Sequence, residues 1–511
     1  MTSVWMDRPD LPVFGPLRAG GTYDVVVAGA GLTGMVTALL LARSGCRVAV
    51  LEARHLGAGT TGHTTAKVSL LQGTRLSTMG KKQPDDIVRA YVEANTEGQQ
   101  WLLRYCDDHG VDVQRRPAYT YATTDSGESA AQAELDACRN AGIKAVWTDT
   151  PELPYPTRGA VRLDDQAQLD PIDVLLALVD DFQQHGGVIF DSTRVTSVQL
   201  GSESTITTDQ GVVTAPQLVL ATGIPVLDRG AYFARLEPLR SYALAFEVPE
   251  CPSGMYLSAD LPTRSLRSLP RAGGELLLVG GNGHTVGRHV PTSELVDDLT
   301  SWTGEHFPGA TLTHSWSAQD YESIDSLPYV GSLTPGGDRC FVATGYDKWG
   351  MTNAVAASLA LSSRILGGST EWAEALDSWR LRELGGLPSA ARLNASVALH
   401  LAEGWLRTAV GNTETGVPEE GQGHVERDGI QPVAVCTVAG QTRRFSAVCP
   451  HLRGILTWND AEASWDCPLH GSRFSAAGDL LEGPATSGLQ EIGGGGAAEG
   501  PNPQAVADHE D

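Results

Sequence analysis

Four side chains near the carboxyl end of the sequence form two matching metal-binding pairs. Cys449-Pro-His451 is followed fifteen residues later by Cys467-Pro-Leu-His470, so each short loop offers one thiolate and one imidazole. Such a set could hold a tetrahedral zinc ion, although structural zinc sites usually take Cys-x2-4-Cys or His-x3-5-His pairs. One cysteine and one histidine on each loop is instead the arrangement of a Rieske [2Fe–2S] centre, in which the cysteines bind one iron and the histidines the other. The pattern therefore favours a [2Fe–2S] cluster over zinc.

A glycine-rich turn near the amino end predicts a second cofactor site. The stretch from Asp24 to Glu52 runs from an apolar strand through Gly29-x-Gly31-x-x-Gly34 into an alanine- and leucine-rich helix and a second strand. In such a βαβ unit the glycines permit a tight turn, close approach of a pyrophosphate and close packing of helix on strand. Glu52 follows at the spacing, about 20 residues, where an acid accepts a hydrogen bond from a ribose hydroxyl. The motif predicts dinucleotide binding but does not separate FAD from NAD.

The composition limits the partners and the compartment. The chain has 511 residues and a net charge of -24. Nucleic acids and anionic membranes are recognised by basic patches, so the acidic excess argues against both as partners. No apolar run approaches the 18 or so residues of a spanning helix, and the first residues lack a secretion signal. Eight cysteines are too few for a disulfide scaffold of this length, so we expect a cytoplasmic protein. The length of the chain predicts two or three domains.

Helices and strands are expected to alternate between the two motifs. Hydrophobic periodicity and helix caps predict three helices, at residues 84–110, 129–142 and 171–186. Residues 188–220 alternate short strands with turns, and an apolar strand at 218–223 returns to the first sheet. Residues 236–320 predict an antiparallel sheet in a second, substrate-side domain. Residues 340–366 predict a strand, a glycine turn and a helix whose amino end faces the cofactor.

The first 385 residues resemble the FAD-dependent D-amino-acid oxidase/glycine oxidase superfamily. The resemblance rests on GAGLTG with Glu52, the GAGTTGHTTAK loop, the LVLATG strand, WSAQDYESIDSLPYVG and the ATGYDKWGMT turn. It implies that the glycine motif and the loop after Glu52 bind FAD. It also implies that Val195 lies by the adenine and that the turn from Gly345 to Thr352 faces the isoalloxazine. Non-covalent FAD is preferred over attachment through His63, which related dehydrogenases use. The residues implied in FAD binding are Gly29, Gly31, Leu32, Thr33, Gly34, Glu52, Ala53, Gly59, Thr60, Thr61, His63, Thr64, Thr65, Ala66, Val195, Ala221, Thr222, Gly223, Gly345, Trp349, Gly350, Met351 and Thr352.

The side chains of the substrate pocket are less well determined. Lys348 and Trp349 lie on the turn expected to face the flavin, and Tyr242 lies on a strand of the substrate domain. For Trp349 and Tyr242, packing in the hydrophobic core is as good an explanation as a role in the substrate pocket. Arg240 could clamp a carboxylate through two hydrogen bonds, but a surface arginine is the plainer interpretation.

A further candidate, His284, lies in the segment LVGGNGHTVG. This segment resembles a GG-acid-x-H-x-x-G segment of the superfamily, but Gly283 stands where the acid usually is, which weakens an acid–base role for His284. Hydride transfer depends on alignment of the substrate carbon with the flavin more than on a strong base. The catalytic candidates are therefore Lys348, Trp349, Tyr242 and His284.

The C-terminal segments CPHLRGILTW and DCPLHGSRFSAAGDLLEGPA resemble Rieske domains closely. The resemblance implies that Cys449, His451, Cys467 and His470 bind the cluster. Disulfide-containing members carry an extra cysteine on each loop, but Gly454 and Leu469 stand at those positions here. Ser472 is present where such domains donate a hydroxyl hydrogen bond, and Phe474 replaces the tyrosine of high-potential members. Fewer hydrogen bonds to sulfur predict a potential in the lower half of the Rieske range, about −150 to +300 mV.

The expected architecture is α/β plus β: a Rossmann-like FAD-binding domain with an antiparallel-sheet substrate domain, followed by a small all-β Rieske domain. Residues 1–385 form the FAD-dependent part, 386–404 a linker and helix, 405–492 the Rieske domain, and 493–511 a disordered acidic tail. Within the first part, FAD binding is assigned to about 20–80, 150–235 and 325–370, and the substrate side to about 81–149 and 236–324.

The two cofactors together indicate an oxidoreductase that relays electrons. The resemblance implies hydride removal from a carbon bearing an amine, with electrons passing singly through the cluster to an external carrier of ferredoxin, cytochrome or quinone type. The substrate would be an amine or amino-acid-like small molecule, and the protein a dehydrogenase. Two alternatives stay open: a reductase or monooxygenase whose FAD is reduced through the cluster by an external donor, and a redox-responsive binding protein. A Rieske oxygenase is disfavoured because the sequence suggests no second His/His/carboxylate iron site.

Overall fold

A six-stranded, mostly parallel sheet carries the glycine motif in this computed structural model. The structure describes residues 1–492 apart from positions 10, 16, 18–19, 272, 381–382, 384–385 and 411–415, so the expected tail at 493–511 lies outside the described residues. The sheet order is β18-β19-β12-β2-β3-β8, and only the β18–β19 pair is antiparallel. The strands are β2 (Val25–Ala28), β3 (Val48–Leu51), β8 (Val188–Phe190), β12 (Gln217–Leu220), β18 (Tyr329–Ser332) and β19 (Cys340–Thr344).

This sheet is buried on both faces, which explains why its strands are continuous apolar runs. Val25 and Val27 point toward one face, which packs against three helices, whereas Val26 and Ala28 point toward a small four-stranded sheet. The helices are α1 (Leu32–Arg43), α5 (Pro171–Gln184) and α7 (Gly350–Ile365). The small sheet contains β1 (Gly21–Thr22), β9 (Val195–Gln199), β10 (Ser204–Thr208) and β11 (Gly211–Ala215).

A larger, mainly antiparallel sheet contains the strands expected at 236–320 together with strands from residues 67–169. Its order is β17-β13-β16-β15-β14-β5-β7-β4, with β6 paired to β7. Its strands are β4 (Lys67–Val68), β5 (Val113–Tyr121), β6 (Val146–Thr148), β7 (Ala160–Leu169), β13 (Leu236–Glu247), β14 (Met255–Ser258), β15 (Arg264–Arg271), β16 (Gly274–Thr285) and β17 (Thr311–Ser323). The helices around it are α2 (Arg75–Met79), α3 (Asp85–Asp108), α4 (Asp125–Asn140) and α6 (Ser293–His306).

The C-terminal part consists of short strands preceded by one long helix. The helix α8 (Leu387–Val410) leads to a three-stranded sheet and then to a four-stranded sheet; the first Cys/His loop connects the two sheets, and the second lies between β24 and β25. The strands are β20 (Gly423–Asp428), β21 (Gln431–Val438), β22 (Gln441–Ser446), β23 (Thr457–Asn459), β24 (Ser464–Asp466), β25 (Arg473–Ser475) and β26 (Leu480–Glu482). Three short 3-10 helices are also present: η1 (Thr60–His63), η2 (Tyr232–Ala234) and η3 (Glu371–Leu376).

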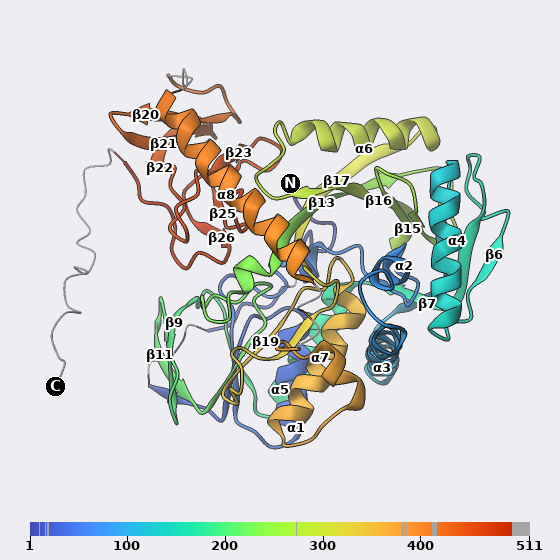
Figure 1. Cartoon of the computed structure of the whole chain (residues 1–511), viewed down its shortest axis with the longest axis horizontal. Coiled ribbons are helices and arrows are strands. Elements are labelled where there is room, and N and C mark those ends of the chain that lie inside the picture. Colours follow the sequence, from blue (N-terminus) through green and yellow to red (C-terminus); the bar gives the residue numbers. More distant parts are fainter. Residues whose placement is uncertain are drawn as a thin grey trace.

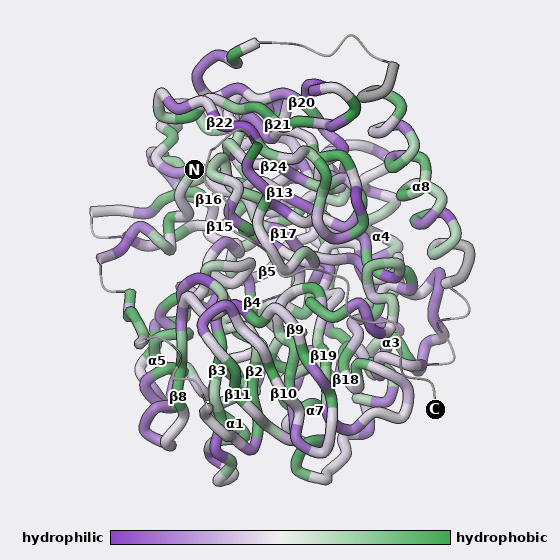
Figure 2. The backbone as a smooth tube through the Cα atoms, turned by 90° about the vertical axis from the view of Figure 1, so that its left-hand side faces the viewer, coloured by the Kyte–Doolittle hydropathy of each residue, from purple (hydrophilic) through white to green (hydrophobic). Residues whose placement is uncertain are grey.

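The C-terminal part docks beside the large sheet and close to the small sheet. Figure 1 shows β20–β26 as a separate orange and red unit above β9 and β11, with α8 running back toward the centre. In Figure 2 the strands β20–β22 lie at one end of the molecule and the glycine-motif sheet at the other, with β13 and β17 between them. Among the described residues, no helix has the length and apolar character needed to span a membrane.

Candidate functional site

The glycine-rich turn meets the end of β12 at the floor of a cavity. Gly29 has a φ of +106°, and a Cβ added there would lie 2.5 Å from the Ala221 carbonyl oxygen. An added Cβ at Gly34 would overlap the Gly29 carbonyl, so α1 approaches the turn closely only because both residues are glycines. Glu52, at the end of β3, accepts hydrogen bonds from the Ala30 N–H (2.8 Å) and the Arg54 N–H (2.9 Å). The turn and the acid therefore form one surface.

Most of the residues implied in FAD binding line this cavity. Of those candidates, the lining includes Gly29, Gly31, Leu32, Thr33, Glu52, Ala53, Gly59, Thr60, Thr61, Thr64, Val195, Ala221, Thr222, Gly223, Gly345, Gly350 and Met351. The same wall contains Arg54 and Arg194, which add positive charge near Glu52. The cavity fits FAD: the amino end of α1 can receive the diphosphate, and the Glu52 carboxylate stands where a ribose hydroxyl needs an acceptor.

Six other candidates lie outside the cavity lining in the part of the chain that the structure describes: Gly34, His63, Thr65, Ala66, Trp349 and Thr352. The Thr65 and Ala66 carbonyls accept hydrogen bonds from the buried Arg267 guanidinium, and the Thr352 hydroxyl donates to Asn95. The His63 ring nitrogen Nδ1 lies 2.8 Å from the Gly59 carbonyl. These side chains shape the surrounding loops.

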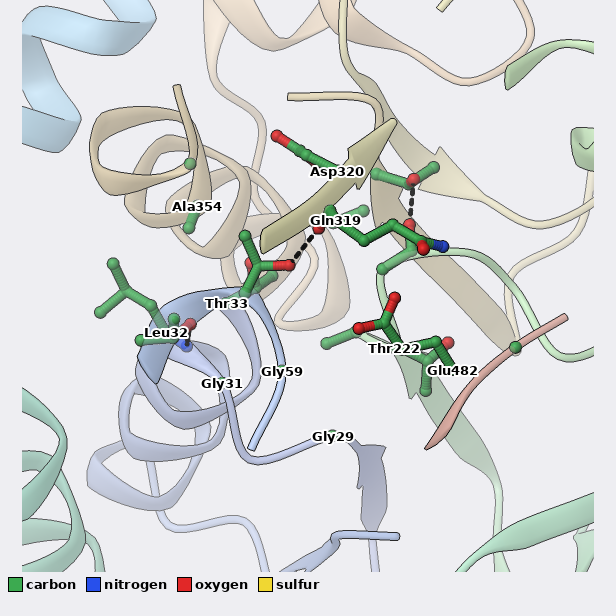
Figure 3. Close-up of a pocket in the computed structure, with 18 of the residues that line it drawn as sticks. Gly29, Gly31, Leu32, Thr33, Gly59, Thr222, Gln319, Asp320, Ala354 and Glu482 are labelled. Atoms are coloured by element: carbon green, nitrogen blue, oxygen red, sulfur yellow. Dashed lines mark hydrogen bonds between the residues drawn. The ribbon is translucent and has the colours of Figure 1, made fainter. Parts of the chain in front are cut away.

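The opposite wall contains residues that the motif analysis missed. Figure 3 shows Gln319 and Asp320 of β17 across the cavity from Gly29, with Glu482 beside them. Asp320 accepts hydrogen bonds from the Tyr321 N–H (2.8 Å) and the Lys348 N–H (2.6 Å), and burial raises its pKa to about 6. Asp320 and Gln319 belong to the WSAQDYESIDSLPYVG segment, which was a signal available in the sequence. Glu482 comes from β26, and no local pattern indicated that the C-terminal part would reach this cavity.

The four catalytic candidates separate into two groups. Lys348 lines the cavity, and an added Cβ at Gly283 would lie 2.5 Å from its Nζ, so the absence of a side chain at position 283 leaves room for the lysine. Trp349 precedes α7 outside the lining. The rings of Tyr242 and His284 stack on each other with centroids 5.8 Å apart, also outside the lining. The structure therefore brings only Lys348 of the four to the cavity.

Arg240 clamps a carboxylate within the protein and is not a surface residue. Its side chain is 3% exposed, and its Nε and Nη2 donate to the two oxygens of Glu462 at 2.6 and 2.7 Å. Arg473 also contacts Glu462 (3.1 Å). Burial acts to raise the pKa of Glu462, but the two arginines outweigh it and lower that pKa below its usual range. These contacts join β13 to the C-terminal part through buried charges.

The four predicted cluster ligands meet at the ends of two loops. The neighbouring Cys467 lowers the pKa of the Cys449 thiol, and the His451 and His470 rings have centroids 5.2 Å apart. Burial, followed by the neighbouring His451, lowers the pKa of His470 to about 4, so its imidazole is neutral at neutral pH, as a metal ligand must be. Within the described ranges, no three or more His, Cys, Asp or Glu side chains are grouped to hold a single ion. A Rieske cluster takes two protein ligands at each of two irons.

The surroundings of the cysteines match the expected departures from the disulfide type. An added Cβ at Gly454 would lie 2.7 Å from the Leu469 side chain and 3.1 Å from the Cys467 sulfur, so the leucine fills the space opposite the glycine. The Ser472 hydroxyl accepts a hydrogen bond from the Ala485 N–H (3.0 Å) and, after Cys467, helps to lower the pKa of the Cys449 thiol. The cysteine pair, the free buried Nδ1 of His470 and this hydroxyl fit a [2Fe–2S] cluster.

Comparison with known proteins finds a family match for each of the two parts of the chain. The family model for FAD dependent oxidoreductases matches residues 24–364, and the model for the Rieske [2Fe-2S] domain matches residues 410–493. A Bacillus subtilis protein named as a Rieske 2Fe-2S iron-sulfur protein, YhfW, is 31% identical over 495 residues, covering 96% of this chain and 97% of that protein. The gamma-glutamylputrescine oxidoreductase of Escherichia coli is 25% identical over 372 residues, covering 66% of this chain and 82% of the relative.

Among solved structures, the glycine oxidase of Geobacillus kaustophilus has the same fold over 69% of this chain and 96% of its own, with a TM-score of 0.58 and 20% identity. The predicted fold class is confirmed by this match and by the two family models. Because one model spans most of the chain and the Bacillus relative nearly all of it, the chain belongs to the family of FAD-dependent oxidoreductases, here joined to a Rieske domain, and its cofactors are FAD and a [2Fe–2S] cluster.

Proposed function

We propose that this oxidoreductase oxidises a carbon–nitrogen bond of a small amine or amino acid and passes the electrons singly through its Rieske domain to an external carrier. The observation that carries the proposal is the shared cavity wall: Leu481, Glu482 and Gly483 of the Rieske part line the same cavity as the glycine motif. A relative named for gamma-glutamylputrescine and a fold neighbour named for glycine support amines and amino acids as the substrate class.

In this proposal each cofactor has a defined set of protein groups. The cavity-lining residues hold FAD, and Cys449, His451, Cys467 and His470 hold the cluster. Bound FAD supplies a hydride acceptor, and the cluster supplies one-electron transfer. One two-electron oxidation of the substrate therefore requires two molecules of a one-electron acceptor outside the chain.

Asp320 is a carboxylate of the cavity wall that can take a proton from the substrate. An amine must lose its ammonium proton before its carbon can give up a hydride, because the nitrogen lone pair stabilises the positive charge that develops. With a pKa of about 6, the Asp320 carboxylate is ionised at neutral pH and able to accept that proton. Its charge, together with that of Glu482, also favours a cationic amine in the cavity.

The test is an anaerobic substrate panel. The purified holoprotein is mixed with D-amino acids, N-methyl amino acids and polyamine derivatives while flavin absorbance and the EPR signal of the reduced cluster are recorded. The proposal expects one class to bleach the flavin, with the Rieske signal appearing at the same time. If dithionite produces the Rieske signal but no amine reduces either centre, the proposal is wrong and the electrons enter through the cluster.

A further inference from the structure

The histidine side of the cluster site is covered by the FAD-binding part of the same chain. The His451 side chain is only 5% exposed, and its Nε2 lies 2.8 Å from an Asp228 carboxylate oxygen. The Phe233 ring stands edge-on to both ligand histidines, with centroids 5.7 Å from His451 and 5.2 Å from His470. Asp228 lies in the connection from β12 to η2 and Phe233 lies in η2 itself, both within the first family match.

This contact leaves the correct ring atoms free for iron. A carboxylate beside Nε2 favours the tautomer with its proton on that atom, so His451 retains the Nδ1 lone pair as a metal ligand. The Nδ1 atom of His470 is likewise buried and has no hydrogen-bond partner among the described residues. Asp228 therefore orients one ligand ring from outside, as carboxylates do for metal-bound histidines in other proteins.

The same connection begins at the FAD cavity. Ala221, Thr222 and Gly223 line that cavity, and Asp228 follows Gly223 by five residues. On the other side of the contact, Leu481 to Gly483 line the cavity from the Rieske part, and the Leu480 carbonyl accepts a hydrogen bond from Arg194 (2.8 Å). The cavity and the ligand histidines are thus linked by one short, continuous stretch of chain.

The FAD-binding part also donates hydrogen bonds directly to the second cluster loop. Gln319, in the cavity wall, donates to the Gly471 carbonyl (2.8 Å), and Arg288 donates to the Pro468 carbonyl (3.0 Å). Both carbonyls flank the ligand His470. An external carrier cannot reach the histidine side while these contacts hold.

We propose that residues 221–233 form the internal electron-transfer contact between the FAD cavity and the cluster, with Asp228 and Phe233 as positioning residues for His451 and His470. This inference rests on the proposed function only in assuming that the two centres exchange electrons. One electron crosses at a time, in either direction, and an external one-electron carrier approaches a different side of the Rieske part.

The experiment uses the holoprotein without substrate, so it is independent of the amine panel. Asp228→Asn removes the charge and keeps the shape, Asp228→Glu restores a carboxylate, and Phe233→Leu removes the ring. Asp338→Asn is the matched control, since Asp338 is an exposed carboxylate of the same part of the chain and lies in the loop between β18 and β19. The midpoint potential of the cluster is measured by EPR at poised potentials. The rate of cluster reduction is measured after light-driven reduction of FAD.

Asp228→Asn is expected to shift the midpoint potential to a more positive value, because a carboxylate at a ligand imidazole stabilises the oxidised cluster. Asp228→Glu should return the potential toward that of the wild type, and Asp338→Asn should leave it unchanged. Phe233→Leu should slow cluster reduction with little change in potential. Potentials in Asp228→Asn equal to those of the control, or wild-type reduction rates in Phe233→Leu, would overturn the proposal. If Asp228→Asn fails to retain the cluster, the rate of cluster reduction in Phe233→Leu alone tests the proposal.

Discussion

Asp320 shows how one residue changes character through its place in the fold. In the sequence it is one of 61 acidic side chains. In the structure it lines the FAD cavity beside Lys348, and two backbone N–H groups hold its oxygens in place. Its pKa is raised to about 6 because burial penalises the charged form more than those hydrogen bonds favour it. A carboxylate with a pKa close to neutral is suited to general base work.

Replacing Asp320 by asparagine should slow flavin reduction by an amine about 10²- to 10⁴-fold, the usual effect of losing a general base. In the wild type, the rate should fall as the pH drops through about 6, because protonated Asp320 cannot accept the substrate proton. This acid limb should be absent in Asp320→Asn. Stopped-flow reduction across a pH series measures both effects. Glu322→Gln is the matched control, since Glu322 lies on the same strand but lines a different cavity; an equal loss in that variant would contradict the role given to Asp320.

At the scale of secondary structure, the β2–α1 turn combines two constraints that can be tested apart. Gly29 has a left-handed backbone, and a Cβ there would also approach the Ala221 carbonyl. Gly45, just after α1, has a similar φ of +90° but open space around it. A comparison of the two positions separates backbone strain from the close approach of β12.

We expect both Gly29→Ala and Gly45→Ala to lower stability, since a non-glycine residue in a left-handed conformation costs about 1–3 kcal/mol. Only Gly29→Ala should also lose FAD, because its Cβ forces the turn away from β12 and opens the cavity floor. Thermal unfolding reports the first effect, and the flavin absorbance per protein reports the second. Normal flavin content in Gly29→Ala would show that the turn tolerates the displacement.

At the scale of the whole molecule, buried charges hold the Rieske part against the large sheet. Arg240 and Arg473 are buried, the Glu462 side chain between them is 12% exposed, and Glu482 lies within 3.7 Å of both arginines. Because the pKa of Glu462 is lowered, its contribution to stability is fully present above the usual glutamate value of about 4.3. That contribution is lost only as the pH falls further, toward the lower pKa of the folded state.

Arg240→Met should destabilise the docked arrangement by about 3 kcal/mol, because it leaves the largely enclosed Glu462 with only one guanidinium partner. The double variant Arg240→Met with Glu462→Gln should recover part of that loss, since no charge is then left short of a partner. Denaturant unfolding followed by both flavin fluorescence and cluster absorbance measures the effect. A single, unshifted transition in Arg240→Met would show that these charges do not hold the two parts together.

The motifs that the sequence revealed are local, and their geometry follows from neighbouring residues. The glycine turn, Glu52 and the two Cys/His loops each depend on spacings within one or two adjacent elements, so residue types predicted a dinucleotide site and a [2Fe–2S] site. The resemblance to a known superfamily then specified FAD and the fold class, and the family matches confirm both. The helix predicted at 84–110 corresponds to α3 at Asp85–Asp108 for the same reason, a periodic apolar face.

The contacts between the FAD-binding part and the Rieske part could not be predicted from local spacings in the sequence. Arg240 meets Glu462 across 222 positions and His451 meets Asp228 across 223, and neither pair carries a spacing or motif in the chain. Their meeting depends on the relative placement of two independently patterned units, which is set by shape and charge over a whole interface. For the same reason Tyr242 and His284, plausible by residue type, lie outside the cavity, whereas Asp320 and Glu482 form its wall. Local sequence carries the identity of each cofactor site, and only the docking of the units brings the two sites together.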